Sequence, residues 1–179
     1  MAALRRPRLL LTALLTAACG ADASTHEVDT GAAATIAVTS KAFGQGDRIP
    51  ERFTCDGEET SPPLAWSGGQ GSDWALVVDD PDAPGGTFVH WVVLDIEKDA
   101  RSVATGQVPA GGVQIVNSSG SASYAGPCPP SGEHHYRFTV YALDDATGLT
   151  GSANLDDALA AVSTHATARG RLTAVYSRQ

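Results

Sequence analysis

The alternation of apolar and polar residues along the chain predicts a domain built mainly from β-strands. Residues 35–39 alternate, as expected of a strand with one buried face. The apolar run 74–78 is continuous and stops at Asp-Asp-Pro, which is typical of a central strand buried on both faces. Two longer strands are expected over 88–96 and 134–143. Shorter strands are expected at 53–55, 64–66, 113–116 and 172–176.

Only one segment has the features of a helix. Asn154 is a good N-cap, acidic residues fill the first turn, and Leu155, Leu159 and Val162 recur at helical spacing. Gly170 is expected to end this helix. Many strands with one late helix, no βαβ alternation and no internal repeat predict a single, mainly β domain.

Strand alternation also predicts where the histidines point. Within 88–96, His90 falls on an apolar face with Phe88, Val92, Leu94 and Ile96. Within 134–143, His134 and Tyr136 share one face, whereas His135 lies on the other. The two adjacent histidines are therefore expected to point in opposite directions.

The first residues read as an export signal. Three arginines at positions 5, 6 and 8 precede an apolar run over 9–18 that is too short to span a bilayer. Small residues before Cys19 fit lipoprotein processing with Cys19 lipidated, although Thr16 stands where leucine is usual. Cleavage by an ordinary signal peptidase at 21–23 is the alternative. We expect an export signal over 1–18, a flexible tether over 19–34 and the β domain over 35–179.

The number of cysteines and the net charge restrict the compartment in which the protein can act and the classes of partner that it can bind. If Cys19 carries lipid, Cys55 and Cys128 remain as an even pair in an oxidising compartment, and we expect them to form a disulfide. Removing the three signal arginines leaves 9 basic against 20 acidic residues, so the mature net charge is near −11. Such a surface repels nucleic acid and anionic lipid. Nucleic acid is therefore excluded as a partner, and contact with the membrane is expected only through the lipid anchor.

Two proline-stiffened turns carry the candidate chemistry. The first is Asp-Asp-Pro-Asp-Ala-Pro at 79–84, which leads into the strand of His90, and the second is Gly-Pro-Cys-Pro-Pro at 126–130, which leads into His134 and Tyr136. Asp before Pro is also a common turn former, and a lone histidine on an apolar face is more often a core residue bonded to a backbone carbonyl. Three such close carboxylates would repel, so at least one should have a cationic or hydrogen-bonding partner.

These turns resemble the two signature regions of the phosphatidylethanolamine-binding protein family, in its bacterial Raf-kinase-inhibitor-like branch. The first match is Asp-Pro-Asp-Ala-Pro followed by His-Trp, and the second is Gly-Pro-Cys-Pro-Pro-x-Gly-x-His-x-Tyr. The resemblance covers roughly 35–179. Further matches lie at 43–44, 49–50, 54–57, 61–66, 117, 124–126, 138–144 and 176–178.

The resemblance implies a central antiparallel sheet flanked by a smaller one, and a pocket for phosphate-like head groups. The implied ligand-binding residues are Asp80, His90, Pro127, Cys128, Pro129, His134 and Tyr136. One departure from the family is His135, where arginine is usual. Because His135 is expected to face away from the pocket, this change puts an outward ion pair in doubt but not the pocket. The Asn-Ile-Pro that often ends the His-Trp strand is also replaced, by Asp-Ile-Glu at 95–97.

The function expected is that of a binding protein with no catalytic residue, metal or cofactor. The histidine imidazoles and the Tyr136 phenol would donate hydrogen bonds to a small anionic or zwitterionic ligand. Asp80 would orient a histidine or bind an amine on the ligand. A peptidase inhibitor, or another module that binds an envelope protein, is the alternative. A less favoured reading is a metal-dependent hydrolase with Asp80, Asp82, His90 and His134 as ligands, because these residues lack a metal-binding spacing.

Overall fold

The computed structural model describes Val28 and residues 30–178. The expected export signal (1–18) and Cys19 lie outside the described residues, as does most of the expected tether. The strands and the helix follow in the order β1 (Ala33–Ala34), β2 (Ile36–Thr39), a 3-10 helix (Glu51–Phe53), β3 (Leu64–Gly68), β4 (Asp73–Asp80), β5 (Phe88–Glu97), β6 (Ser102–Val103), β7 (Val113–Ile115), β8 (Glu133–Leu143), α1 (Leu155–His165) and β9 (Ala166–Ser177).

The strands form two sheets. The larger has the order β1-β9-β8-β4-β5-β7 and the smaller the order β2-β3-β6. All pairings between these strands are antiparallel except that of β1 with β9, so the large sheet is mixed only at this edge. The predicted class, a mainly β fold with a smaller second sheet and one helix near the C-terminus, is confirmed.

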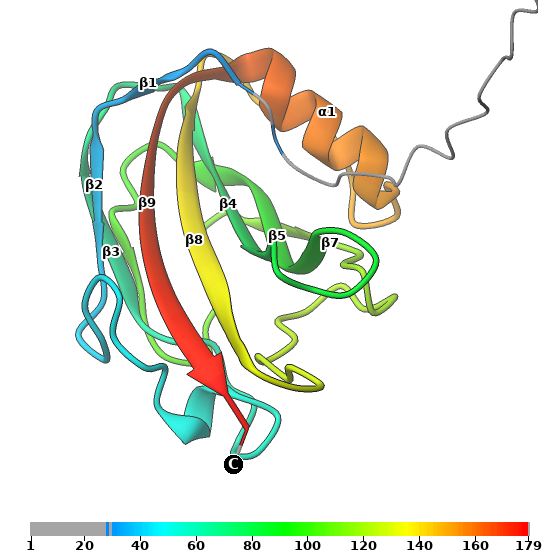
Figure 1. Ribbon diagram of the computed structural model, residues 1–179. Helices are drawn as coiled ribbons and strands as arrows, with labels where there is room; N and C mark the ends of the chain where they lie inside the picture. The colour runs from blue at the N-terminus through cyan, green and yellow to red at the C-terminus, as the bar shows by residue number, and fades with distance from the viewer. Residues whose placement is uncertain (1–27, 29, 179) are drawn as a thin grey trace, which may run out of the picture.

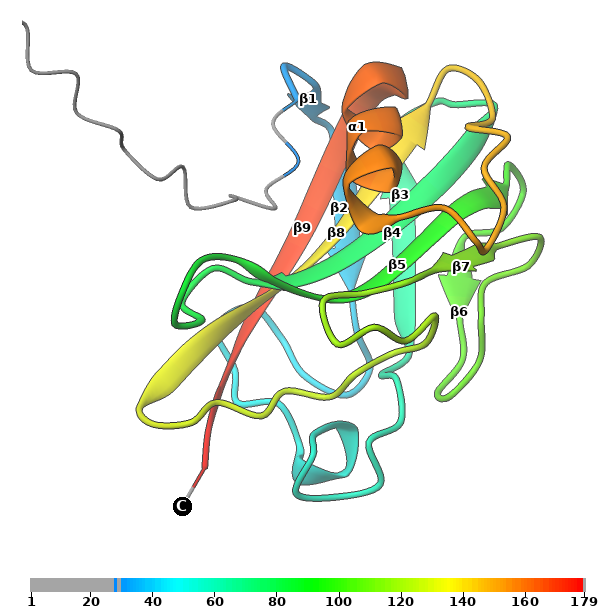
Figure 2. The ribbon, with the colours of Figure 1, turned by 90° about the vertical axis from the view of Figure 1, so that its right-hand side faces the viewer.

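The large sheet is the middle layer of three, with the small sheet on one face and α1 on the other (Figures 1 and 2). Between the sheets, Trp66 of β3 packs against Trp74 of β4 with ring centroids 6.4 Å apart, in a core that also takes Phe138 from β8. On the opposite face, Leu159 and Val162 of α1 pack against apolar residues of β4, β5 and β8. Both faces of β4 are therefore buried, as its continuous apolar run predicts.

Two sequence-based expectations about local structure are wrong. Residues 53–55 do not form a strand, because the chain after Pro50 turns into the 3-10 helix, where Phe53 N–H donates to the Pro50 carbonyl at 2.9 Å. The helix ends at His165 and not at Gly170, which lies inside β9. A Cβ at position 170 would overlap the backbone of Ile36 in β2, so this glycine permits a close crossing of two strands.

The strict alternation expected for 88–96 is also wrong, because β5 contains two irregularities. Its register with β4 shifts between Val78 and Asp79 and between Trp74 and Leu76. As a result Trp91 and Ile96 join the core between the sheets, although they were expected on opposite faces. Asp95 takes a left-handed conformation with φ of 51° at the second shift. The first shift lies next to His90 and decides which way that side chain points.

Ordered contacts begin ahead of residue 35. Ala33 and Ala34 pair in parallel with β9, and Val28 is buried in the core beneath α1. Within Val28 and residues 30–178, no helix is both long enough and apolar enough to cross a membrane.

Candidate ligand-binding pocket

Each carboxylate of the first turn has a basic partner on β8. Arg137 donates from Nε and Nη2 to the two oxygens of Asp79, at 2.7 and 2.6 Å. His134 Nδ1 lies 2.7 Å from Asp80 Oδ2. His135, on the opposite face of β8, contacts Asp82 Oδ2 through both its backbone N–H and its Nδ1, each at 2.8 Å. Pairing therefore offsets the repulsion expected among three close carboxylates, and His135 lies in an outward ion pair.

The Asp80–His134 pair is buried, with side chains only 5% and 8% exposed. A carboxylate can only accept, so the hydrogen lies on Nδ1 of His134 and Nε2 is the ring nitrogen left for a ligand. The other oxygen of Asp80 accepts from the Asp82 backbone N–H at 2.8 Å, which holds the carboxylate in the turn. Strand β4 thus positions an acid that fixes both the orientation and the tautomer of His134.

His90 is fixed in a different way. Its Nδ1 donates to the carbonyl of Ala125 at 2.8 Å, and its ring lies 4.8 Å from that of Phe88 and 5.3 Å from that of Tyr136. Burial is the main cause that lowers the pKa of His90, against smaller opposing effects from the hydrogen bond to Ala125 and the charge of Asp80. His90 is therefore neutral at pH 7, with Nε2 available as an acceptor. The histidine that Asp80 orients is therefore His134, whereas His90 is oriented by a backbone carbonyl.

Asn117 organises the loop that holds His90. Its side-chain N–H groups donate to the carbonyls of His90 and Ser123, at 3.0 and 2.9 Å. Its oxygen accepts from the backbone and hydroxyl of Ser119 and from the backbone of Ser121. Asn117 is buried, so these five bonds fix the path from β7 to Ala125. The sequence shows residue 117 only as a match to the family, because nothing local in the sequence indicates this role.

Tyr136 lies at the base of the pocket with its side chain fully buried. Its hydroxyl has no hydrogen-bond partner of normal geometry among the described residues. Burial raises the pKa of Tyr136, and the charge of Asp80 and a weak side-chain interaction with that carboxylate raise it further, so the phenol keeps its hydrogen at any physiological pH. A buried donor without a partner is costly, which makes this hydroxyl the clearest candidate to donate to a ligand.

The rim of the pocket contains the Cys55–Cys128 disulfide, which joins residues 73 positions apart. Cys128 and Pro129 line the cavity, whereas Pro127 is buried and is not among the lining residues. The Pro127 carbonyl accepts from the Cys55 backbone N–H at 3.1 Å. Glu59, which the sequence analysis missed, also lies at this rim. Its Oε1 accepts from the Gly126 backbone N–H at 3.1 Å.

Together these groups enclose a cavity of about 350 Å³. Among the described residues, its wall contains two carboxylates, two imidazoles and one phenol, but no lysine or arginine. The lining residues are Cys55, Glu59, Asp80, Ala83, Pro84, Phe88, His90, Ser119, Ala125, Gly126, Cys128, Pro129, Pro130, His134 and Tyr136. The cavity is of a size for a small molecule or head group, and it offers few polar groups on a largely apolar wall.

The ligand set of the metal-hydrolase reading does not converge on one point. Asp82 is turned outward to His135, and Nδ1 of His90 is used by Ala125. Among Val28 and residues 30–178, no three or more His, Cys, Asp or Glu side chains are grouped so that they could hold a metal ion.

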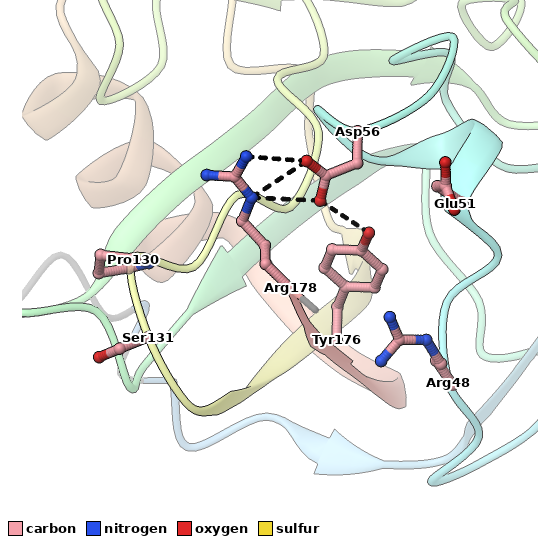
Figure 3. Close-up of a pocket in the computed structure, with 7 residues that line it drawn as sticks. All are labelled: Arg48, Glu51, Asp56, Pro130, Ser131, Tyr176 and Arg178. Atoms are coloured by element: carbon pink, nitrogen blue, oxygen red, sulfur yellow. Dashed lines mark hydrogen bonds and ion pairs between the residues drawn. The ribbon is translucent and has the colours of Figure 1, made fainter.

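A second depression, of about 560 Å³, lies on the other side of Pro130 (Figure 3). Its charged groups largely satisfy one another: Tyr176 Oη donates to Asp56 at 2.9 Å, and Arg178 Nε donates to the same carboxylate at 3.0 Å. Arg48 lies over the Tyr176 ring and donates to Ser177. The depression is polar, and none of the described residues that line it has a buried donor or acceptor without a partner, so the cavity at His134 is the better candidate.

Comparison with known proteins identifies the family of the chain. The family model described as phosphatidylethanolamine-binding protein matches residues 39–177. A UPF0098 protein of the archaeon Methanothermobacter thermautotrophicus is 44% identical over 144 residues, which is 76% of this chain and 95% of the archaeal protein.

A Mycobacterium tuberculosis protein named "Putative lipoprotein LppC" is 45% identical over 148 residues, which is 81% of this chain and 74% of that protein. The crystal structure of Escherichia coli YbcL, described as a new member of the mammalian PEBP family, superposes with a TM-score of 0.77 at 30% identity. The match covers 82% of this chain and all of YbcL.

Proposed function

Because the chain belongs to the phosphatidylethanolamine-binding protein family, we propose that it is a binding protein whose pocket holds a small phosphate-like or phosphoethanolamine-like ligand. The buried Tyr136 hydroxyl carries this proposal, since it makes no hydrogen bond of normal geometry to any described residue and lines a cavity that also contains His134. A ligand oxygen that accepts from this phenol would satisfy a donor that the fold leaves unsatisfied.

The protonation states of the lining groups restrict the ligand further. Neutral His90 offers only an acceptor, so its ligand contact must carry a hydrogen. His134 is held by Asp80, whose Oδ2 lies 2.7 Å from Nδ1, so Nε2 is the ring nitrogen left to meet a ligand. A phosphate monoester with one hydroxyl group matches this set, because it can donate that hydrogen to an imidazole Nε2 and accept from the Tyr136 hydroxyl.

The proposal can be tested by titrating the protein with inorganic phosphate and with phosphoethanolamine while the imidazole resonances are followed by NMR. We expect the signals of His90 and His134 to move together and to saturate. His165 provides the internal control, because it pairs with Asp144 beyond the pocket and should not move. Absence of any change at both His90 and His134 would rule out the proposed ligand class.

We also propose that the protein is exported and held at the cell envelope by lipid on Cys19. The arginine-led apolar segment at 1–18 and the cysteine that follows support this, as does the lipoprotein name of a relative that is 45% identical. Mass spectrometry of the protein from the membrane fraction should find an acylated N-terminal Cys19, and a Cys19→Ser variant should leave that fraction. A mature chain that begins beyond Ala23 would contradict lipidation.

A further inference from the structure

Glu59 is the carboxylate at the pocket rim whose charge has no partner. The other acidic residues of this loop are paired, Asp56 with Arg178 at 2.9 Å and Glu58 with Arg52 at 3.5 Å. Inside the pocket, Asp80 is paired with His134. Glu59 makes no ion pair with any residue among 28 and 30–178, although its side chain lines the cavity.

The backbone at Glu59 is held in a conformation that glutamate rarely adopts. Its φ is 53°, in the left-handed region, which costs roughly 1–3 kcal/mol for a residue with a side chain. Part of that cost is offset because Oε1 of Glu59 accepts from Gly126 at 3.1 Å and joins its loop to the Pro-Cys-Pro-Pro turn. A neutral amide oxygen would serve this bond equally well. The bond therefore explains the position of the side chain but not its negative charge.

The charge of Glu59 faces a cavity without any balancing lysine or arginine. Its field reaches inward, where it contributes to raising the pKa of the buried Tyr124 and opposes the burial effect on His90. The interior of the same cavity offers the Tyr136 hydroxyl as a donor to an anionic group. The two ends of the pocket thus differ, with a phenol donor at the base and an unpaired carboxylate at the rim.

We propose that Glu59 is the specificity-determining residue of the pocket, and that it selects ligands carrying a positively charged group beside the phosphate-like group. This inference rests on the proposed function. Oε2 of Glu59 has no hydrogen-bond partner among the described residues and would accept from a ligand ammonium group at the rim. Free phosphate and simple alkyl phosphates lack that contact and are disfavoured by the same charge.

The test compares phosphoethanolamine with propyl phosphate, which has the same length but a methyl group in place of the ammonium. Isothermal titration calorimetry on the mature chain should give a Kd about tenfold lower for phosphoethanolamine, as expected for one hydrogen bond to a charged group. In Glu59→Gln the ratio should fall to about one, because Gln keeps the bond to Gly126 and removes only the charge. Raising the salt concentration should reduce the wild-type ratio as well.

Glu58→Gln is the matched control, since Glu58 is the adjacent residue and its carboxylate pairs with Arg52. This variant should keep the tenfold preference. Equal binding of both esters by the wild-type protein, or an unchanged preference in Glu59→Gln, would overturn the role of Glu59 while leaving the proposed pocket intact. If the wild-type protein binds neither ester, the proposed function fails together with this inference.

Discussion

Nδ1 of His134 lies 2.7 Å from Oδ2 of Asp80, and strands β8 and β4, which carry them, are hydrogen-bonded neighbours. The pair lies inside the fold, so neither group can exchange its partner for water. Asp80 therefore sets the side from which His134 meets a ligand. A buried charge is costly when it is unpaired. Breaking this pair should therefore lower both the stability of the domain and the affinity of its pocket.

Asp80→Asn should weaken both stability and binding. Asn has the same shape but no charge, so the free energy of unfolding should fall by about 2–3 kcal/mol, and the affinity for phosphate should fall about tenfold or more. Asp82→Asn is the control, because its pair with His135 is largely exposed and should contribute under about 1 kcal/mol. Urea denaturation and calorimetry measure the two effects. Equal losses in both variants would show that the buried pair has no special role.

Tyr136→Phe should separate binding from folding. The hydroxyl makes no hydrogen bond of normal geometry to any described residue, so removing it should leave the free energy of unfolding unchanged or raise it by up to about 1 kcal/mol. The affinity for phosphate should nevertheless fall about tenfold, because the ligand loses a donor. A variant that is destabilised but binds normally would instead assign the hydroxyl a structural bond.

Buried His90 should make the domain less stable in mild acid. Its pKa is lowered in the folded state, so the unfolded chain takes up a proton near pH 6.5 and the folded chain only at lower pH. Stability is then lost as the pH falls below about 6.5. In His90→Asn, the free energy of unfolding should depend less on pH between 7 and 5, by up to about 1.4 kcal/mol per pH unit. Parallel curves for variant and wild type would contradict this assignment.

The Cys55–Cys128 disulfide should support both stability and the pocket rim. It closes a loop whose ends are 73 residues apart, so replacing both cysteines by serine should cost about 4 kcal/mol in the chain-entropy picture. Both cysteines line the cavity, and the affinity for phosphate should fall as well. Denaturation of the oxidised protein, the reduced protein and the double variant measures this. Equal stability of all three would contradict a structural role.

Gly170→Ala should disturb the crossing of β2 over β9. The added methyl group would overlap the Ile36 carbonyl, and we expect a loss of about 3 kcal/mol in the free energy of unfolding. Gly31→Ala is the control, because the new methyl group would meet no atom within 4 Å. Thermal unfolding followed by circular dichroism is sufficient. A shift in Tm no larger than that of the control would show that the strands can separate without cost.

Much of the domain could be predicted from local sequence patterns. Burial alternates over the first residues of β8, so the sharing of one face by His134 and Tyr136 and the outward direction of His135 agree with the structure. The end of α1 could not be placed, because Gly170 usually stops a helix and here permits close contact with Ile36. Ile36 lies far away in sequence, so the residues around position 170 do not indicate that the two strands come into contact.

The sequence by itself determined most of the strands, the direction of His134, His135 and Tyr136 on β8, the two turns and the pair of cysteines. These features depend on the two-residue repeat of a strand, on the fixed φ of proline and on the even number of cysteines after position 19. Only the tertiary structure decided that His134 rather than His90 meets Asp80, and that Asn117 and Glu59 complete the pocket. Those contacts depend on the register between distant strands and on the irregularity beside His90. Register is set by the packing of the whole sheet, so no single stretch of sequence encodes it.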